Sequence, residues 1–188
     1  MCRFFTQDDP VHWALRNTTA RLDELGIPYA VAGGMALGAH RFVRATVDVD
    51  ILVTREGLAA VSRQLEGTAY VPAPDGRRGL KDAATGVRID FLVAGQFPGD
   101  GKPKPVAFPD PAKAAVVIGG IRFLGLPTLV ELKLASGMTN PGRLRDLADV
   151  QELIRLLALP RDFADQLNPY VRPRYDELWQ GLQSDTGP

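Results

Sequence analysis

The sequence predicts a mixed α/β (α+β) fold: a small mixed β-sheet flanked by helices, with a helical part at the C-terminus. Helical and strand-like hydrophobic patterns alternate at first, hairpin patterns follow, and only helical patterns come after them. The hydrophobic fraction of 45% and the charged fraction of 23% are typical of a globular chain with a real core. We expect a core over residues 1–125, a helical part packed on it over 126–183, and a frayed tail over 184–188.

The N-terminal elements follow from capping residues and periodicity. A helix is predicted from Asp9 and the proline after it, because Asp is a good N-cap and Pro is tolerated in the first turn. Apolar residues then recur at helical spacing until Gly26. An apolar strand at 29–32 comes next, followed by a glycine pair and a short helix over 33–41.

Residues 46–53 alternate as a half-buried strand does. One side carries Val47, Val49, Ile51 and Val53, and the other carries Thr46, Asp48, Asp50 and Leu52. Thr54 then caps a further helix. After a loop over 72–79, the segments 80–84 and 87–94 form a predicted hairpin, whose second strand repeats the alternation with Arg88, Asp90 and Leu92 on one side.

The C-terminal elements begin with a second hairpin, in which 115–118 and 121–124 flank a Gly-Gly turn. A loop rich in Gly, Pro and Lys precedes it. Thr128 and Glu131 fit a capping box, which predicts a helix from Thr128 to about Ser136. An amphipathic helix then ends near Ala158, and weaker helical patterns follow.

The composition excludes several kinds of site. The formal net charge is zero, so a nucleic-acid partner would need a local basic patch. The single cysteine, Cys2, excludes an internal disulfide and a Cys-rich zinc site, and only two histidines are present. No apolar run nears the roughly 20 residues that span a bilayer, and the N-terminus lacks a signal-peptide core. We therefore expect a cytoplasmic protein with no membrane partner.

Paired carboxylates are the main chemical signal. Asp48 and Asp50 lie two apart in one predicted strand, so both side chains leave the same face. Asp90 has the same setting in a second strand, and the three carboxylates converge if the two strands are neighbours. Clustered carboxylates repel each other unless cations neutralise them, and Mg²⁺ is usually held by a few carboxylates plus substrate phosphates. The alternative is a solvated strand face that bears ordinary acids.

Gly33 and Gly34 end a buried strand and open a short helix. Glycine permits positive φ and lets backbone amides approach a ligand, and a helix N-terminus favours a phosphate. A plain strand-to-helix turn is the alternative, since such turns also favour glycine. The pattern is not a Walker loop, because no Gly-Lys-Ser/Thr follows, and it lacks the third glycine of the dinucleotide fingerprint.

Three motifs in order carry a resemblance: Gly33-Gly34, then TVDVD over 46–50, then RIDF over 88–91. They resemble the signature of the DNA polymerase β-type nucleotidyltransferase superfamily, which is a Gly-Gly or Gly-Ser turn, an Asp-x-Asp pair and a later strand aspartate. The string GGMALGAHRFVRATVDVDI and the later LVELKLASGMTNPGRLRDLADVQELI look most like the bacterial minimal nucleotidyltransferases that include the AbiEii and MenT toxins. The resemblance covers residues 29–93, extends more weakly to Leu157, and implies the nucleotidyltransferase fold.

The resemblance also implies an activity. A metal-dependent enzyme of this kind transfers NMP from an NTP to an acceptor hydroxyl and releases pyrophosphate. Asp48, Asp50 and Asp90 would bind two Mg²⁺ ions, with Mn²⁺ as a substitute, and Asp90 would also help deprotonate the attacking hydroxyl. The backbone amides of Gly33 and Gly34 would hold the triphosphate.

Further residues are implied as contacts to the nucleotide. Arg44 and Thr46 stand just before the carboxylates, as an arginine and a threonine often do in the toxin-like group, although Arg44 could instead brace the carboxylates. Lys133 would pair with a phosphate, and Asp146 or Asp149 would contact the nucleotide or orient Lys133. An exposed lysine and ordinary Asp–Arg pairs on one helix are the competing interpretations.

The acceptor stays open. The toxin-like group implies RNA, such as a tRNA end, with an antitoxin protein as partner, whereas antibiotic nucleotidyltransferases with the same core act on small molecules; no DNA partner is expected. Met35 stands where many relatives have Ser or Thr, so a hydroxyl contact to phosphate is lost. Met35 is the one feature that supports a third alternative, a nucleotide-binding or interaction module without catalysis.

Overall fold

The computed structural model describes residues 9–73 and 79–184, so most of the predicted loop over 72–79 and residues 185–188 of the predicted tail lie outside the described residues. Within the described chain there are two compact units. The first comprises the chain through Ala94 together with Pro109–Leu124, and the second comprises Gly95–Phe108 and the chain from Gly125 onward. In the described residues, no helix is long and apolar enough to cross a membrane.

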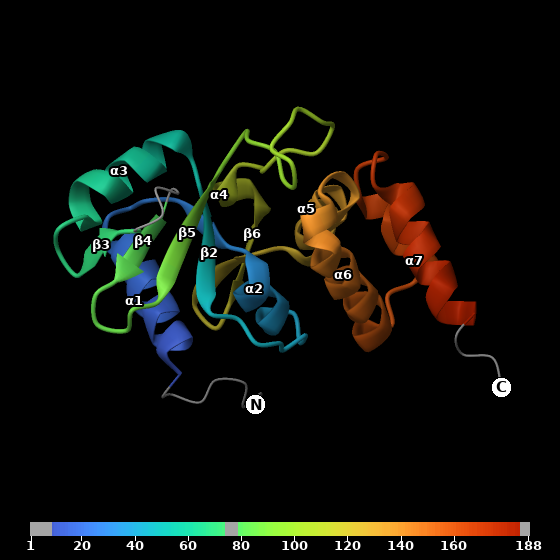
Figure 1. Ribbon diagram of the computed structural model, residues 1–188, viewed down its shortest axis with the longest axis horizontal. Coiled ribbons are helices and arrows are strands. Elements are labelled where there is room, and N and C mark those ends of the chain that lie inside the picture. Colours follow the sequence, from blue (N-terminus) through green and yellow to red (C-terminus); the bar gives the residue numbers. More distant parts are fainter. Residues whose placement is uncertain (1–8, 74–78, 185–188) are drawn as a thin grey trace. The chain divides into compact units, whose positions relative to one another are not determined.

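The first unit is built on a seven-stranded mixed sheet in the order β3-β4-β5-β2-β1-β7-β6 (Figure 1). The pairs β2–β5 and β1–β7 are parallel, and the other neighbours are antiparallel. This sheet confirms the predicted fold class and both predicted hairpins. The strands are β1 (Tyr29–Val31), β2 (Asp48–Val53), β3 (Tyr70–Pro72), β4 (Gly79–Asp82), β5 (Arg88–Val93), β6 (Ala115–Ile118) and β7 (Ile121–Leu124).

Helices of the first unit are α1 (Pro10–Glu24), α2 (Gly33–Ala39), α3 (Arg55–Leu65) and the short α4 (Pro111–Ala114). The predicted caps are confirmed: the Asp9 side chain accepts from the Val11 amide, and the Thr54 side chain accepts from the Gly57 amide. Helix α2 packs on β2 and β7, and α3 packs on β5. One face of β2 and β5 forms core, with Val49, Ile51, Val53, Ile89, Phe91 and Val93 all buried.

The second unit is helical, with α5 (Leu126–Thr139), α6 (Leu144–Leu157), α7 (Arg172–Ser184) and the 3₁₀ turns η1 (Pro141–Arg143) and η2 (Arg161–Gln166). Helix α5 packs against α6. The predicted helix start at Thr128 is wrong, because α5 begins at Leu126 with Gly125 as its N-cap. Pro127 explains the earlier start, since proline suits the first turn, where its missing N–H is not needed.

The loop Gly95–Phe108 belongs to the second unit because its backbone is held by residues there. The Asn140 Nδ2 donates to the Gly99 carbonyl and the Asn168 Nδ2 donates to the Pro105 carbonyl, both at 3.2 Å. Gly99 has a φ of +75° and lies so close to α5 that a Cβ there would be 2.8 Å from the Ser136 carbonyl oxygen. A glycine with left-handed backbone is therefore needed where this loop meets α5.

Candidate active site

The three predicted carboxylates lie on one face of two neighbouring strands. Strands β2 and β5 are parallel and in register, so that Asp50 is the direct neighbour of Asp90, and Asp48 is the neighbour of Arg88. Neighbouring strands stand roughly 4.8 Å apart, which brings these side chains within reach of one another. The opposite face is the core, and the carboxylates are half-buried. We call Asp48, Asp50, Asp90, Thr46 and Arg88 the carboxylate patch.

The glycine turn at the start of α2 lies directly against the patch. Gly33 has a φ of +56°, and a Cβ built there would stand 1.8 Å from Asp50 Oδ2. A Cβ at Gly34 would stand 2.8 Å from Thr46 Oγ1. Both positions thus require glycine for steric reasons, and Gly33 also requires it for its left-handed backbone. The glycine pair and the TVDVD segment, which are separate motifs in the sequence, are therefore in contact in the fold.

A third glycine, which the sequence analysis did not single out, lies on the other side of the patch. Gly79 of β4 is the register partner of Asp90, and a Cβ there would be 2.9 Å from Asp90 Oδ1 and 2.8 Å from the Ile89 carbonyl oxygen. Asp50 and Asp90 are therefore each flanked by glycine backbone. The Asp50 carboxylate occupies space that a side chain at Gly33 would fill, and the Asp90 carboxylate occupies space that a side chain at Gly79 would fill.

Hydrogen bonds restrain Asp48 and Asp90. Thr46 Oγ1 donates to Asp48 Oδ1 at 3.0 Å, and Arg88 Nε donates to Asp90 Oδ1 at 2.6 Å. The Arg44 side chain donates through Nη1 to the carbonyl of its neighbour Ala45 at 3.2 Å. Among these, Arg88 is the contact that sequence reasoning missed, although the alternation of 87–94 had placed it on the same face as Asp90.

The patch fits Mg²⁺ in its donor type, since carboxylate oxygens are the ligands that this ion prefers. It is not a closed cage: over residues 9–73 and 79–184, no group of three or more His, Cys, Asp or Glu side chains is arranged to hold a metal ion. Mg²⁺ bound through one or two carboxylates plus substrate phosphates needs no such cage. The residues therefore fit an open site that a substrate would complete.

A second cluster of charges lies in the second unit, between α5 and α6. Lys133 Nζ donates to Asp146 Oδ1 at 2.9 Å and to Asp149 Oδ2 at 2.7 Å. The Ser136 hydroxyl and Arg143 Nε donate to Asp146 Oδ2 at 2.7 and 2.8 Å. The side chains of Lys133, Asp146 and Asp149 are 8%, 6% and 3% exposed, whereas that of Arg143 is 57% exposed. We call these five residues the Lys133 network.

Electrostatics within the network favour the ionised form of Asp146. Burial raises the pKa of the Asp146 carboxyl, but the Lys133 ammonium, helped by the Ser136 hydroxyl and the Arg143 guanidinium, outweighs that effect. The pKa of Asp146 therefore lies below its usual value. The predicted residues thus fall into two groups, one on the sheet of the first unit and one between the helices of the second. Ser136 joins the second group, and its position one helical turn after Lys133 is the signal that could have identified it.

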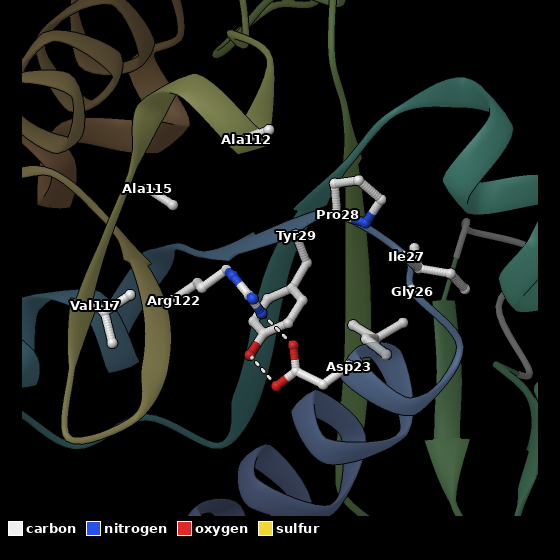
Figure 2. Close-up of a pocket in the computed structure, with 10 residues that line it drawn as sticks. Asp23, Gly26, Ile27, Pro28, Tyr29, Ala112, Ala115, Val117 and Arg122 are labelled. Carbon is white, nitrogen blue, oxygen red and sulfur yellow. Dashed lines mark hydrogen bonds and ion pairs between the residues drawn. The ribbon is translucent and has the colours of Figure 1, made fainter.

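A separate hollow of about 410 Å³ lies in the first unit, away from the carboxylates, beside the end of α1 and the hairpin β6–β7 (Figure 2). Its polar groups bind each other: the Tyr29 hydroxyl donates to Asp23 Oδ2 at 3.2 Å, and Arg122 pairs with Asp23. The Arg122 guanidinium carbon lies 5.4 Å from the centre of the Tyr29 ring. Burial, and then the Asp23 charge, raise the pKa of Tyr29. With its charges paired internally, this hollow is a weaker candidate for catalysis than the carboxylate patch.

Comparisons with known proteins support the fold. No family model matches the sequence, and no curated protein matches it significantly. Among solved structures, ANT(2″)-Ia in complex with adenylyl-2″-tobramycin is similar with a TM-score of 0.52 and 14% identity, over 93% of this chain and 98% of that one. The solution structure of the antibiotic-resistance factor ANT(2″)-Ia gives a TM-score of 0.53 and 14% identity, over 94% of this chain and 95% of that one.

An antigenic nucleotidyltransferase-like protein from Paracoccidioides brasiliensis is similar with a TM-score of 0.51 and 16% identity, over 79% of this chain and 77% of that one. At these identities the likeness concerns the fold alone. The chain therefore has a nucleotidyltransferase fold, as the sequence predicts, and the assignment of its chemistry depends on its own residues.

Proposed function

We propose that this protein is a metal-dependent nucleotidyltransferase that transfers NMP from an NTP to an acceptor hydroxyl. The observation that carries the proposal is the register of β2 and β5, which sets Asp50 beside Asp90 on the half-buried face while Gly33 lies against Asp50. A carboxylate cluster on a sheet face with a core on its reverse has no evident structural use, because its charges repel each other. A nucleotidyltransferase fold gives that cluster a chemical use.

In the proposed reaction, the acceptor oxygen forms a bond to the α-phosphorus as the bond to pyrophosphate breaks. Asp48, Asp50 and Asp90 would hold two Mg²⁺ ions, or Mn²⁺ in their place, and those ions would neutralise phosphate charge and favour the ionised hydroxyl. Asp90 would accept the proton of the attacking hydroxyl. Backbone amides of Gly33 and Gly34 would position the triphosphate, and Thr46 orients the carboxylate of Asp48 through its hydrogen bond. Catalysis of this type relies on positioning and charge neutralisation, which these residues can supply.

For the residues of the second unit, the geometry favours one of the two predicted roles. Asp146 and Asp149 both accept from Lys133, so they orient the ammonium. An ammonium has three donors, and these two contacts use two of them. We propose that the predicted contact of Lys133 to a phosphate uses the third donor. Arg44 remains a proposed phosphate contact or brace near the start of β2.

Two acceptor classes follow from different observations. The resemblance of the motifs to AbiEii- and MenT-type toxins favours an RNA acceptor, such as a tRNA end, and with it an antitoxin partner. Similarity in fold to ANT(2″)-Ia, solved with adenylyl-2″-tobramycin, favours a small-molecule acceptor. Met35, which stands at the third position of α2, favours the alternative of a non-catalytic module.

Labelled transfer tests the proposal and separates these outcomes. The full chain is incubated with each α-³²P-labelled NTP and Mg²⁺ or Mn²⁺, with either total RNA or a panel of aminoglycosides and hydroxyl-bearing metabolites as acceptor. We expect label to reach one acceptor class, and the double variant Asp48→Ala/Asp50→Ala to abolish it. Asp165→Asn, which removes an exposed carboxylate of η2, is the matched control and should transfer as wild type does.

Equal transfer by the double variant and wild type would show that the metal-site proposal is wrong. Transfer by neither protein, with equal NTP binding by both, would favour the non-catalytic module. A small antitoxin-like gene beside the coding sequence would favour the RNA acceptor over the small molecule.

A further inference from the structure

Strand β6 is an edge of the seven-stranded sheet and lacks the features that usually protect an edge. The sheet order places β7 on one side of β6 and no described strand on the other. An edge strand turns N–H and C=O groups outward, and charged residues, proline or a bulge usually keep other strands away. β6 reads Ala-Val-Val-Ile, with no charge and no proline, and its register with β7 is continuous. Its outer edge is therefore suited to pairing with a further strand.

The side chains of β6 add apolar surface to this edge on both faces of the sheet. Val117 is 69% exposed and Val116 is 41% exposed, and as neighbours in a strand they point to opposite faces. Ala115 and Val117 share one face and line the hollow of about 410 Å³ beside α1 (Figure 2). A strand that paired with β6 would thus cover apolar side chains on both faces while it formed backbone hydrogen bonds.

The opposite edge of the sheet, strand β3, has a different character. Pro72 ends β3 and has no N–H to donate to a further strand. Val71 is 44% exposed there, but its register partner on β4 is the exposed Lys81. Proline and lysine are residues that discourage pairing at an edge. Of the two edges, β6 is therefore the one that favours docking.

We propose that β6 pairs antiparallel with β6 of a second copy of this chain, so that the two sheets join about a twofold axis. In such a contact each residue lies opposite or near its own counterpart, so any charge on the strand would face the same charge. β6 bears none, and the exposed Lys113 belongs to α4, outside the strand. Arg122 of β7 is paired with Asp23, and the chain has a formal net charge of zero. Two copies are thus not kept apart by charge.

The contact is small and does not involve the carboxylate patch. One pair of four-residue strands lies at the small end of specific interfaces, so we expect a dissociation constant on the order of 10–100 µM. Strands β1 and β7 separate β6 from β2, the strand that carries Asp48 and Asp50. Pairing at β6 is therefore independent of the proposed activity, and Asp48→Asn should dimerise as wild type does.

Sedimentation equilibrium of the full chain over about 1–500 µM tests the proposal, with a reductant present to prevent a disulfide through Cys2. We expect wild type to pass from monomer to dimer over this range. Val117→Glu should weaken the dimer about tenfold or more, because two like charges then approach each other across the twofold axis. In its own chain the new carboxylate lies opposite Arg122, so the fold should be retained.

The opposite edge provides the matched control. Val71→Glu also replaces an exposed valine of an edge strand and also lies opposite a cation, Lys81, so it should dimerise as wild type does. Mixing Val117→Glu with Val117→Lys brings opposite charges together across the axis and should restore a dimer that neither variant forms alone. Circular dichroism and thermal unfolding establish that each variant is folded, and Val116→Glu is the replacement if Val117→Glu does not fold.

Amide hydrogen exchange locates the contact, since amides of residues 115–118 should exchange more slowly at high protein concentration than at low. A wild type that stays monomeric at every concentration would overturn the proposal. Dimers of equal strength in wild type and Val117→Glu would refute it too, because the copies would then meet through another surface. Equal weakening in Val71→Glu and Val117→Glu would exclude β6 as the specific contact.

Discussion

The carboxylate patch and the Lys133 network contain the same kinds of group in opposite surroundings. In the network, two carboxylates share one ammonium between packed helices, and the three side chains are less than a tenth exposed. In the patch, carboxylates stand side by side on a half-buried sheet face whose neighbouring backbone is glycine. Buried paired charges stabilise the packing of α5 against α6, whereas clustered acids beside glycine backbone leave room for a ligand. Variants of the network should therefore lose stability as well as the proposed phosphate contact of Lys133, whereas variants of the patch should lose mainly chemistry.

Lys133→Met should have the largest effect on stability. It leaves Asp146 and Asp149 as buried carboxylates without their ammonium, and breaking a buried pair by removing one partner typically costs about 3–5 kcal/mol of unfolding free energy. Urea unfolding followed by circular dichroism measures this loss. Lys113→Met, at an exposed lysine of α4, is the matched control and should stay within about 0.5 kcal/mol of wild type.

Stability equal to wild type in Lys133→Met would contradict the stabilising role of the Lys133 network. It would show that the two aspartates become protonated or reach water at little cost. The triple variant Lys133→Met/Asp146→Asn/Asp149→Asn separates the causes, because it removes the charges together and should recover part of the loss.

Gly33→Ala should damage the patch by steric means. An L-residue at a φ of +56° is strained by about 1–3 kcal/mol. The new Cβ also overlaps Asp50 Oδ2, so the carboxylate must move, and a misplaced reacting group can cost about a hundredfold in rate. We expect that loss in NMP transfer with an intact far-ultraviolet spectrum. Gly38→Ala, in the same helix α2 with nothing within 4 Å of its Cβ, should keep full activity.

The sequence predicts the two regions unequally, for physical reasons. Side chains alternate between the two faces of a strand over 46–53 and 87–94, and this determines which face each aspartate leaves. Asp48, Asp50 and Asp90 could therefore be found from local pattern alone. Alternation does not say which strands pair. Strands β2 and β5 are parallel neighbours although β3 and β4 lie between them in the chain, and the placement of Asp50 beside Asp90 depends on that register.

The network was harder to predict because it depends on packing between helices. Lys133 and Asp146 are thirteen residues apart, with a 3₁₀ turn between them, so helical spacing cannot relate them. The sequence left an exposed lysine and a paired one as alternatives, and the structure shows Lys133 paired and buried. Gly79 was not predicted for a similar reason, since glycine is necessary there only because pairing with β5 brings the Ile89 carbonyl and the Asp90 carboxylate close to it.

Asp146→Asn should change how stability depends on acid pH. The folded pKa of Asp146 lies below its usual value, so this group contributes stability above the unfolded pKa of about 3.9, and the contribution is lost as pH falls through the folded pKa. The unfolding free energy of wild type should thus decline below about pH 4, and the Asn variant should decline less steeply there. Urea unfolding from pH 6 down to pH 2.5 compares the two slopes. Identical slopes would show that Asp146 gains nothing from Lys133 on folding.

Asp48→Asn should change stability least, and it sharpens the contrast with Lys133→Met. It removes one of the acids that repel each other on the patch, while the Asn oxygen can still accept from Thr46 Oγ1. The unfolding free energy should therefore stay within about 0.5 kcal/mol of wild type or rise slightly, even though NMP transfer is lost. A loss of more than about 1 kcal/mol would mean that the bond between Thr46 and Asp48 helps to anchor the start of β2. Asp48 would then combine a structural role with a chemical one, and the separation between a region that stabilises and a region that binds would fail at this residue.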